Sequence, residues 1–169
     1  MAVKLSSTIT YHGGVVQTLP EFPAMLKQAL ADAIVLYHQK FLHRHFGTPA
    51  EVAALYPGIY QPRSTRYMKR KAAEKGHQRM LMWGGDSAAS VLSAITITGT
   101  YKEVRGRMKG ANKNFNFSGV DKLGRRKPMM GVELTYTNDA ESQEQVEIVD
   151  KNVQAFLDKE TPVTTVEIR

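Results

Sequence analysis

Apolar residues recur along this chain with two different spacings, and each spacing predicts a type of element. Over residues 2 to 11 apolar side chains alternate with polar ones, which predicts a half-buried β-strand. They then recur at every third or fourth position up to about His45, which predicts a long amphipathic helix. Thr18 and Glu21 form a capping-box signature at its start, and Gly47 is expected to end it.

Two shorter helices are predicted next. A second capping box begins at Thr48, and the helix that it starts is expected to run to about Leu55. Ser64 is placed to cap a basic helix over residues 65 to 75, and Gly76 is expected to end that helix in the left-handed conformation. This basic helix has a weak apolar face, so we expect it to be half exposed.

The second half of the chain is richer in glycine. Asp86 or Ser87 is expected to cap a short helical turn after a glycine pair, and residues 94 to 98 alternate and predict a strand. Residues 99 to 131 combine repeated glycines with nine basic residues, which predicts a long, twisted, basic hairpin or extended loop. Alternation over residues 132 to 136 predicts another strand.

A last helix and a weak final segment complete the pattern. Asn138 and Glu141 form a third capping signature, and a clean apolar stripe then continues to Leu157 with the acidic residues on the other face. Residues 161 to 169 alternate weakly and are expected to form a strand or an arm. The chain is therefore predicted to be a single α+β domain over residues 1 to 169, with a long N-terminal helix and a C-terminal helix packed on a mainly antiparallel sheet.

Charge is distributed very unevenly along the chain. The stretch from Arg63 to Lys127 holds 16 basic and four acidic residues, a net charge of +12, whereas the 62 residues before it carry +1. The residues after it hold nine acidic against three basic residues, which gives −6. Because net charge acts at long range on polyanions, the basic middle is expected to meet an anionic partner.

The sequence offers little support for an enzyme. There is no cysteine, which excludes thiolate nucleophiles and cysteine-based zinc sites. The five histidines show no metal-binding spacing, so we expect ordinary surface or capping histidines, with no metal and no cofactor. No nucleophile motif is present, and a hydrolase that uses His77 with Asp86 is supported only by their closeness in sequence. No catalytic residue is therefore assigned.

The N-terminal residues and the apolar runs bear on location. Residues 1 to 14 contain no continuous apolar segment of the kind found in secretory signals, and no apolar run approaches the roughly 20 residues needed to span a bilayer. We therefore expect no membrane partner and folding in a reducing cytoplasm.

The basic middle divides into two parts. The first is the helix over residues 65 to 75, whose charges a solvated face would explain equally well. The second is the glycine-rich segment, where arginines suit phosphate or carboxylate and glycines allow close backbone approach. Phe115 and Phe117 in that segment could stack on bases, but in a hairpin such residues more often pack against a neighbouring subunit or the chain's own core. No motif for base-specific readout is present, so only backbone-level attraction to nucleic acid is expected.

Two sets of candidate site residues follow. The basic residues expected to face DNA or a protein partner are Arg63, Arg66, Lys69, Arg70, Lys102, Arg105, Arg107, Lys109, Lys113, Arg125, Arg126 and Lys127. The residues expected at subunit or ring contacts are Trp83, Phe115, Phe117 and Met129.

Over residues 20 to 160 the chain resembles the small neck and tail-completion proteins of tailed bacteriophages. The resemblance lies in the order of short motifs: Tyr60-Gln61-Pro62-Arg63-Ser64-Thr65-Arg66-Tyr67 with its basic helix, Leu81-Met82-Trp83-Gly84-Gly85, Lys127-Pro128-Met129-Met130-Gly131-Val132-Glu133-Leu134-Thr135, and the closing helix from Glu141 to Leu157. Two features depart from the family pattern. The Gly84-Gly85-Asp86 turn is less simple than the usual one, and the segment over residues 99 to 131 is long.

The resemblance implies a non-enzymatic virion protein in the phage neck, assembled in the host cytoplasm. Such a protein would form a homo-oligomeric ring, a hexamer or dodecamer, around the channel where head joins tail. Its partners would be other copies of itself, virion proteins on the connector or portal side and on the tail-terminator side, and the genomic DNA, which it would contact without sequence specificity. The alternative from a different class is a stand-alone basic RNA- or DNA-binding protein.

Overall fold

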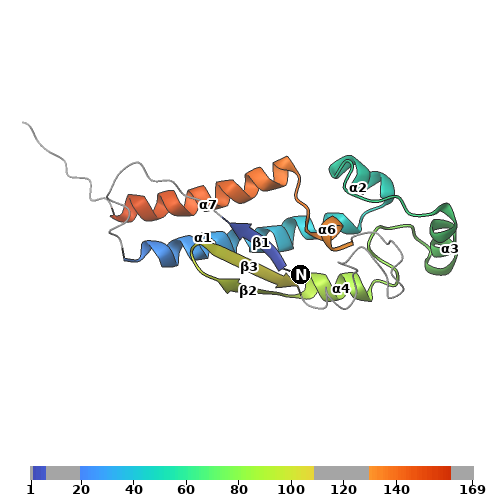
Figure 1. Cartoon of the computed structure of the whole chain (residues 1–169), viewed down its shortest axis with the longest axis horizontal. Coiled ribbons are helices and arrows are strands. Elements are labelled where there is room, and N and C mark those ends of the chain that lie inside the picture. The colour runs from blue at the N-terminus through green and yellow to red at the C-terminus, as the bar shows by residue number, and fades with distance from the viewer. Residues whose placement is uncertain (1, 7–19, 109–129, 161–169) are drawn as a thin grey trace, which may run out of the picture.

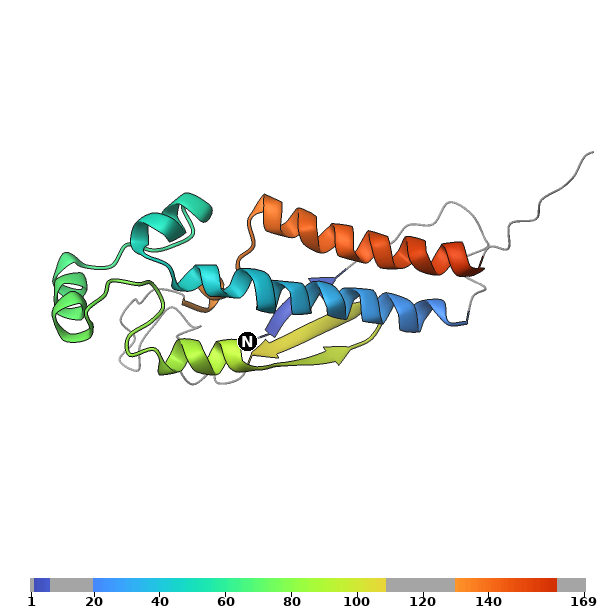
Figure 2. The same ribbon diagram turned by 180° about the vertical axis from the view of Figure 1, so that it is seen from behind.

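The computed structural model describes residues 2–6, 20–108 and 130–160. Within these residues a small antiparallel sheet is covered on one face by a long helix, and a second long helix runs beside the first in the opposite direction (Figures 1 and 2). Shorter helices extend the molecule beyond one end of the helix pair. The α+β class predicted from the sequence is confirmed at this level.

The sheet has three strands in the order β1-β3-β2, with β1 at Ala2–Ser6, β2 at Ile95–Gly99 and β3 at Glu103–Met108. Both pairings are antiparallel, and Val3, Gly106 and Ile97 lie in register across the three strands. The predicted strand over residues 94 to 98 is confirmed, and β1 matches the first part of the predicted N-terminal strand. The β2–β3 connection is a short turn at residues 100–102. The long basic hairpin is not established, because residues 109–129 lie outside the described part of the chain.

Helix α1 (Phe22–Leu36) packs on the sheet through its apolar stripe, as the sequence predicts. Its start differs from the prediction: Glu21 is the N-cap without a side-chain bond, and Thr18 lies outside the described residues. The helical path continues through a π-helical turn, η2 (Tyr37–Phe41), and a 3-10 turn, η3 (Leu42–Phe46). A π-helical turn has more residues per turn than an α-helix and a 3-10 turn has fewer, so the residues that face inward change along this segment. Adjacent residues are therefore buried in pairs, for example Phe41 with Leu42 and His45 with Phe46.

Two of the predicted short helices begin and end as expected. Helix α2 (Pro49–Leu55) has a complete capping box from Thr48, and helix α3 (Thr65–Lys75) is capped by Ser64 and ended by Gly76 at φ +70°. Helix α4 (Asp86–Ser93) is also present, but Gly85 is its N-cap with no side-chain bond. The predicted capping by Asp86 or Ser87 is therefore wrong, because the helix already includes both residues.

The predicted strand over residues 132 to 136 is wrong: Met130–Thr135 forms a helical turn, α6. Glu133 and Leu134 are adjacent and both buried, whereas a strand would turn them to opposite faces. The alternating pattern also fails on exposure, because Val132 is 39% exposed while Leu134 is fully buried. Thr135 bonds back to the carbonyl of Gly131, one turn earlier.

Helix α7 (Asp139–Glu160) is capped as predicted, with Asn138 Oδ1 accepting from the backbone nitrogen of Glu141 at 2.9 Å. Val149, Val153 and Phe156 of its apolar stripe pack against the cluster around α1. Two parts of the prediction fail. Val146 of the stripe is exposed, and Glu141 is buried although acids were expected on the outer face.

The core has three parts. The largest lies under η2, η3, α4 and α6, the second joins α1 to the sheet and α7, and the third joins α2 to Met80. Gly106 allows α1 to approach the sheet closely, because a Cβ there would lie 2.6 Å from Ile34 Cγ2 and from Ile95 Cδ1. The sheet face that carries Thr96, Arg105 and Arg107 is exposed.

Candidate functional site

A buried polar cluster lies at the junction of η2, η3 and α6. Tyr37 donates a hydrogen bond to the carbonyl of Leu134, and its oxygen lies 3.3 Å from His45 Nε2. On the other side of the imidazole, Nδ1 lies 2.7 Å from the hydroxyl of Tyr60. Tyr37 gives its proton to the carbonyl, so Nε2 must be the protonated nitrogen and Nδ1 the acceptor.

Aromatic packing encloses the same imidazole. His45 stacks on Tyr56 with ring centroids 4.4 Å apart and planes 11° apart. Burial lowers the pKa of His45 to about 4, so the ring is neutral at ordinary pH. His38 is also buried and bonds the carbonyl of Val91 at 3.0 Å. The expectation of ordinary surface or capping histidines is therefore wrong for these two.

Two buried carboxylates complete the cluster, and each has a fixed arginine partner. Glu133 is 1% exposed, receives two hydrogen bonds from Arg63 and accepts a third from the backbone nitrogen of Gln61 at 2.9 Å. Glu141 accepts from Arg44 at 3.0 Å and from Tyr56 at 2.8 Å. Burial near these carboxylates raises the pKa of Tyr56 and of Tyr60. The groups satisfy one another out of solvent, so the cluster is structural.

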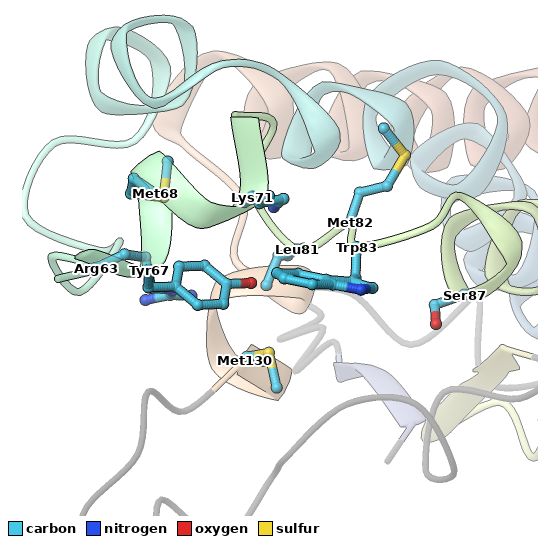
Figure 3. A pocket seen from close by; sticks show the side chains of 9 residues that line it. All are labelled: Arg63, Tyr67, Met68, Lys71, Leu81, Met82, Trp83, Ser87 and Met130. Atoms are coloured by element: carbon cyan, nitrogen blue, oxygen red, sulfur yellow. The ribbon is translucent and has the colours of Figure 1, made fainter. Parts of the chain in front are cut away.

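The solvent-facing candidate site is a pocket of about 160 Å³ between α3, the segment before α4, and α6 (Figure 3). Tyr67 and Trp83 lie next to each other in it, with ring centroids 5.6 Å apart, and Met130 lies below them in the view. The residues that line the pocket are Arg63, Tyr67, Met68, Lys71, Leu81, Met82, Trp83, Ser87 and Met130. Most of this lining is apolar or aromatic, with two cations.

Lys71 is the unusual member of the lining, because it is only 2% exposed. Its ammonium donates to the carbonyl of Arg79 and lies 5.7 Å from the ring centroid of Tyr67. Burial, with Arg63 nearby, lowers its pKa. The sequence placed Lys71 on a half-exposed face, so its burial is a correction: the segment after α3 folds back over it.

Further cations lie at the rim, around Trp83. The guanidinium of Arg70 lies 5.1 Å from the Trp83 ring centroid, and the ammonium of Lys75 lies 5.9 Å from it. Both cations are within the range of cation–π attraction. Leu81, in the floor, has φ +51°, which is rare for a residue with a side chain and found most often where surrounding structure enforces it.

The predicted basic residues divide into several environments. Arg63 is internal, with its side chain 12% exposed and paired to Glu133, so it is not the free surface cation that the sequence suggested. Arg66 and Lys69 are exposed on α3, and Arg70 is exposed beside Glu74 at 3.6 Å. These α3 residues share one end of the molecule with Trp83, whereas the next group lies on the sheet (Figure 1).

On the sheet, Arg105 and Arg107 are exposed on the same face of β3, and Lys102 is exposed in the turn before it. Arg105 is paired to Glu103 at 2.5 Å. In register, Thr98 lies opposite Arg105 and Thr96 opposite Arg107. The remaining predicted residues lie outside the described part of the chain: Lys109, Lys113, Phe115, Phe117, Arg125, Arg126, Lys127 and Met129.

Of the residues that line the pocket, Trp83 and Arg63 were among the candidates from the sequence, and the others were missed. Tyr67, Leu81 and Met130 come from three separate segments, and no local pattern indicates that they converge. The available signal was an apolar run directly before the Gly84-Gly85 break, with a basic helix upstream.

Neither a metal-binding cluster nor a membrane-spanning helix is found among the described residues. Nowhere in residues 2–6, 20–108 and 130–160 do three or more histidine or acidic side chains come together in a way that could hold a metal ion. Among the helices of that part of the chain, none is long and apolar enough to cross a membrane. Comparison of the chain with protein-family models, with curated proteins and with solved structures found no match in any of the three.

Proposed function

We propose that this chain is a non-enzymatic structural protein of a tailed-phage neck, which assembles as a homo-oligomeric ring where head joins tail. One observation carries the proposal: the molecule has exposed cations on two separate surfaces, whereas its buried polar groups are matched internally. The resemblance in motif order supports the choice of this family, and the charge layout agrees with a subunit that contacts both DNA and protein neighbours.

The two cationic surfaces suit different neighbours. Arg105 and Arg107 lie on an exposed sheet face beside threonines, which suits contact with the phosphates of a duplex without base readout. Arg70 and Lys75 surround an aromatic side chain and a pocket, which suits a protein partner with an acidic surface. A ring subunit around DNA requires both kinds of contact.

The proposal is tested by incorporation into particles. The purified full chain is mixed with neck-deficient connectors and tails, and the products are examined by electron microscopy. We expect added density at the head–tail joint and recovery of joined particles. A protein that neither joins particles nor binds connectors or tails under any condition would refute the proposal.

The stand-alone nucleic-acid-binding alternative is supported by the same cations and by Trp83, whose ring could stack on a base. It predicts tight binding to free RNA or DNA, with an affinity that falls steeply as salt rises. Affinity that remains in the micromolar range or weaker at low salt, together with particle incorporation, would favour the neck protein. Tight free binding without incorporation would favour the alternative.

A further inference from the structure

We infer that the pocket at Trp83 is the acceptor site for helix α7 of a second copy of this chain, so that the copies join head to tail. The inference rests on the proposed ring and deepens it, because it names the two surfaces that meet. The acceptor surface consists of the pocket with its rim cations Arg70 and Lys75. The donor surface consists of Val146, Glu147 and Asp150 on α7.

The acceptor surface is built for an apolar side chain flanked by carboxylates. Its interior offers aromatic rings and methionines, and its volume of about 160 Å³ admits a single side chain. The buried ammonium of Lys71 donates to the carbonyl of Arg79 and faces the ring of Tyr67, so it adds positive charge behind the lining without itself contacting a partner. Leu81, which lines the pocket, has a left-handed backbone conformation, which a residue with a side chain adopts only when the surrounding structure enforces it.

The donor surface has the complementary chemistry. Val146 is 51% exposed, whereas Val149, Val153 and Phe156 of the predicted apolar stripe pack inward. Asp150 lies one turn after Val146 on the same face of the helix, and Glu147 follows Val146 directly and lies to the same side as Asp150. Glu147 is held by Gln143 at 3.2 Å, and both acids are exposed. An exposed apolar side chain thus lies beside two exposed carboxylates on the same helix.

The two surfaces do not meet within one chain. Helix α3 lies at one end of the molecule, and α2 lies between it and the start of α7 in both views (Figures 1 and 2). A contact between them must therefore join two copies through different surfaces. Such heterologous contacts close into a ring when the rotation between copies allows it.

A charge swap tests the contact. Self-association of the full chain is measured by sedimentation velocity for the original protein, Arg70→Glu, Glu147→Lys and the double variant. Each single reversal places like charges opposite each other, and we expect it to weaken association at least about tenfold. The double variant restores opposite charges and should recover to within about threefold. Val146→Ser should weaken association without affecting folding, because that side chain is already exposed.

Lys27→Glu, an equal charge reversal at an exposed position of α1, is the matched control and should leave association unchanged. A monomeric original protein, or single reversals without effect, or a double variant weaker than both singles, would overturn the inference. Incorporation into particles is scored separately for the same variants. If all variants are incorporated into particles equally well, the neck role remains and this contact is refuted. If the double variant restores self-association but no variant is incorporated into particles, the neck role alone is refuted.

Discussion

His45 lies at the centre of a cluster whose hydrogen bonds require a neutral imidazole. Its Nε2–H donates to Tyr37 and its Nδ1 accepts from Tyr60, while Tyr56 covers one face of the ring. A second proton on Nδ1 would remove the acceptor and place a charge where no water reaches. The neighbouring Arg44 adds to the cost.

We therefore predict that the protein loses stability in mildly acidic solution because of His45. Its pKa is about 4 in the folded chain and about 6.5 when unfolded, so the unfolded state binds the proton first as pH falls. The contribution is fully present above about pH 6.5 and is lost progressively down to about pH 4. The total loss is roughly 3 kcal/mol, to be measured by urea denaturation between pH 7.5 and 4.5.

A variant separates this effect from general acid destabilisation. His45→Gln should be less stable than the original protein at pH 7.5 but should lose much less further stability by pH 5. His77→Gln, at a less buried position, should retain the full pH dependence. Equal slopes for His45→Gln and the original protein would show that another group is responsible.

The sequence alone could not reveal this cluster. Charged residues are normally exposed, and the partners that justify burying Glu133 and Glu141 lie 70 and 97 positions away, at Arg63 and Arg44. Lys71 is buried for a similar reason, because the chain that covers it returns after α3 ends. Local patterns contain no information about such distant partners.

At the scale of elements, the sequence correctly predicted where several helices begin and end from their capping residues and from the glycine that ends α3. Thr48, Ser64 and Asn138 cap helices as predicted, because the capping groups lie within three residues of the backbone that they bond. The predicted strand at residues 132 to 136 is wrong because so short a segment cannot distinguish a period of two from one helical turn. Glu133 and Leu134 are adjacent and both buried, which a helical turn allows and a strand with one buried face does not.

Gly106 controls how closely α1 approaches the sheet, and we predict that Gly106→Ala destabilises the fold. The added Cβ would lie 2.6 Å from Ile34 Cγ2 and Ile95 Cδ1, so one of these side chains must move. Overpacking of this kind costs about 1–3 kcal/mol, measurable as a lower urea midpoint. Gly84→Ala is the control, because nothing lies within 4 Å of a Cβ there. A shift no larger than the control's would contradict the prediction.

At the scale of the whole molecule, charge and fold were predictable to different degrees. Periodicity was enough to predict an α+β chain with a long helix at each end of the described fold, because those patterns extend over many turns. The concentration of cations in the middle of the sequence did not show that, among the described residues, one group lies on α3 and another on the sheet (Figure 1). That division depends on the path of the chain between Gly76 and β2.

Under the proposed function, the sheet face predicts which arginine contributes most to binding of duplex DNA. Arg107 is exposed, with Thr96 opposite it in register, whereas Arg105 is held by Glu103. Arg107→Ala should therefore weaken DNA binding more than Arg105→Ala, and it should reduce the slope of log affinity against log salt by about 1. Fluorescence anisotropy with a random-sequence duplex at several salt concentrations measures both quantities.

Lys27→Ala, an exposed cation on α1 away from this face, should leave the slope unchanged. Equal losses for all three variants would mean that binding depends on net charge alone. If only Arg107→Ala changes the slope of log affinity against log salt, DNA phosphates contact the exposed face of the sheet. The slope is proportional to the number of phosphates that the protein neutralises, so it decreases only when a cation that contacts a phosphate is removed.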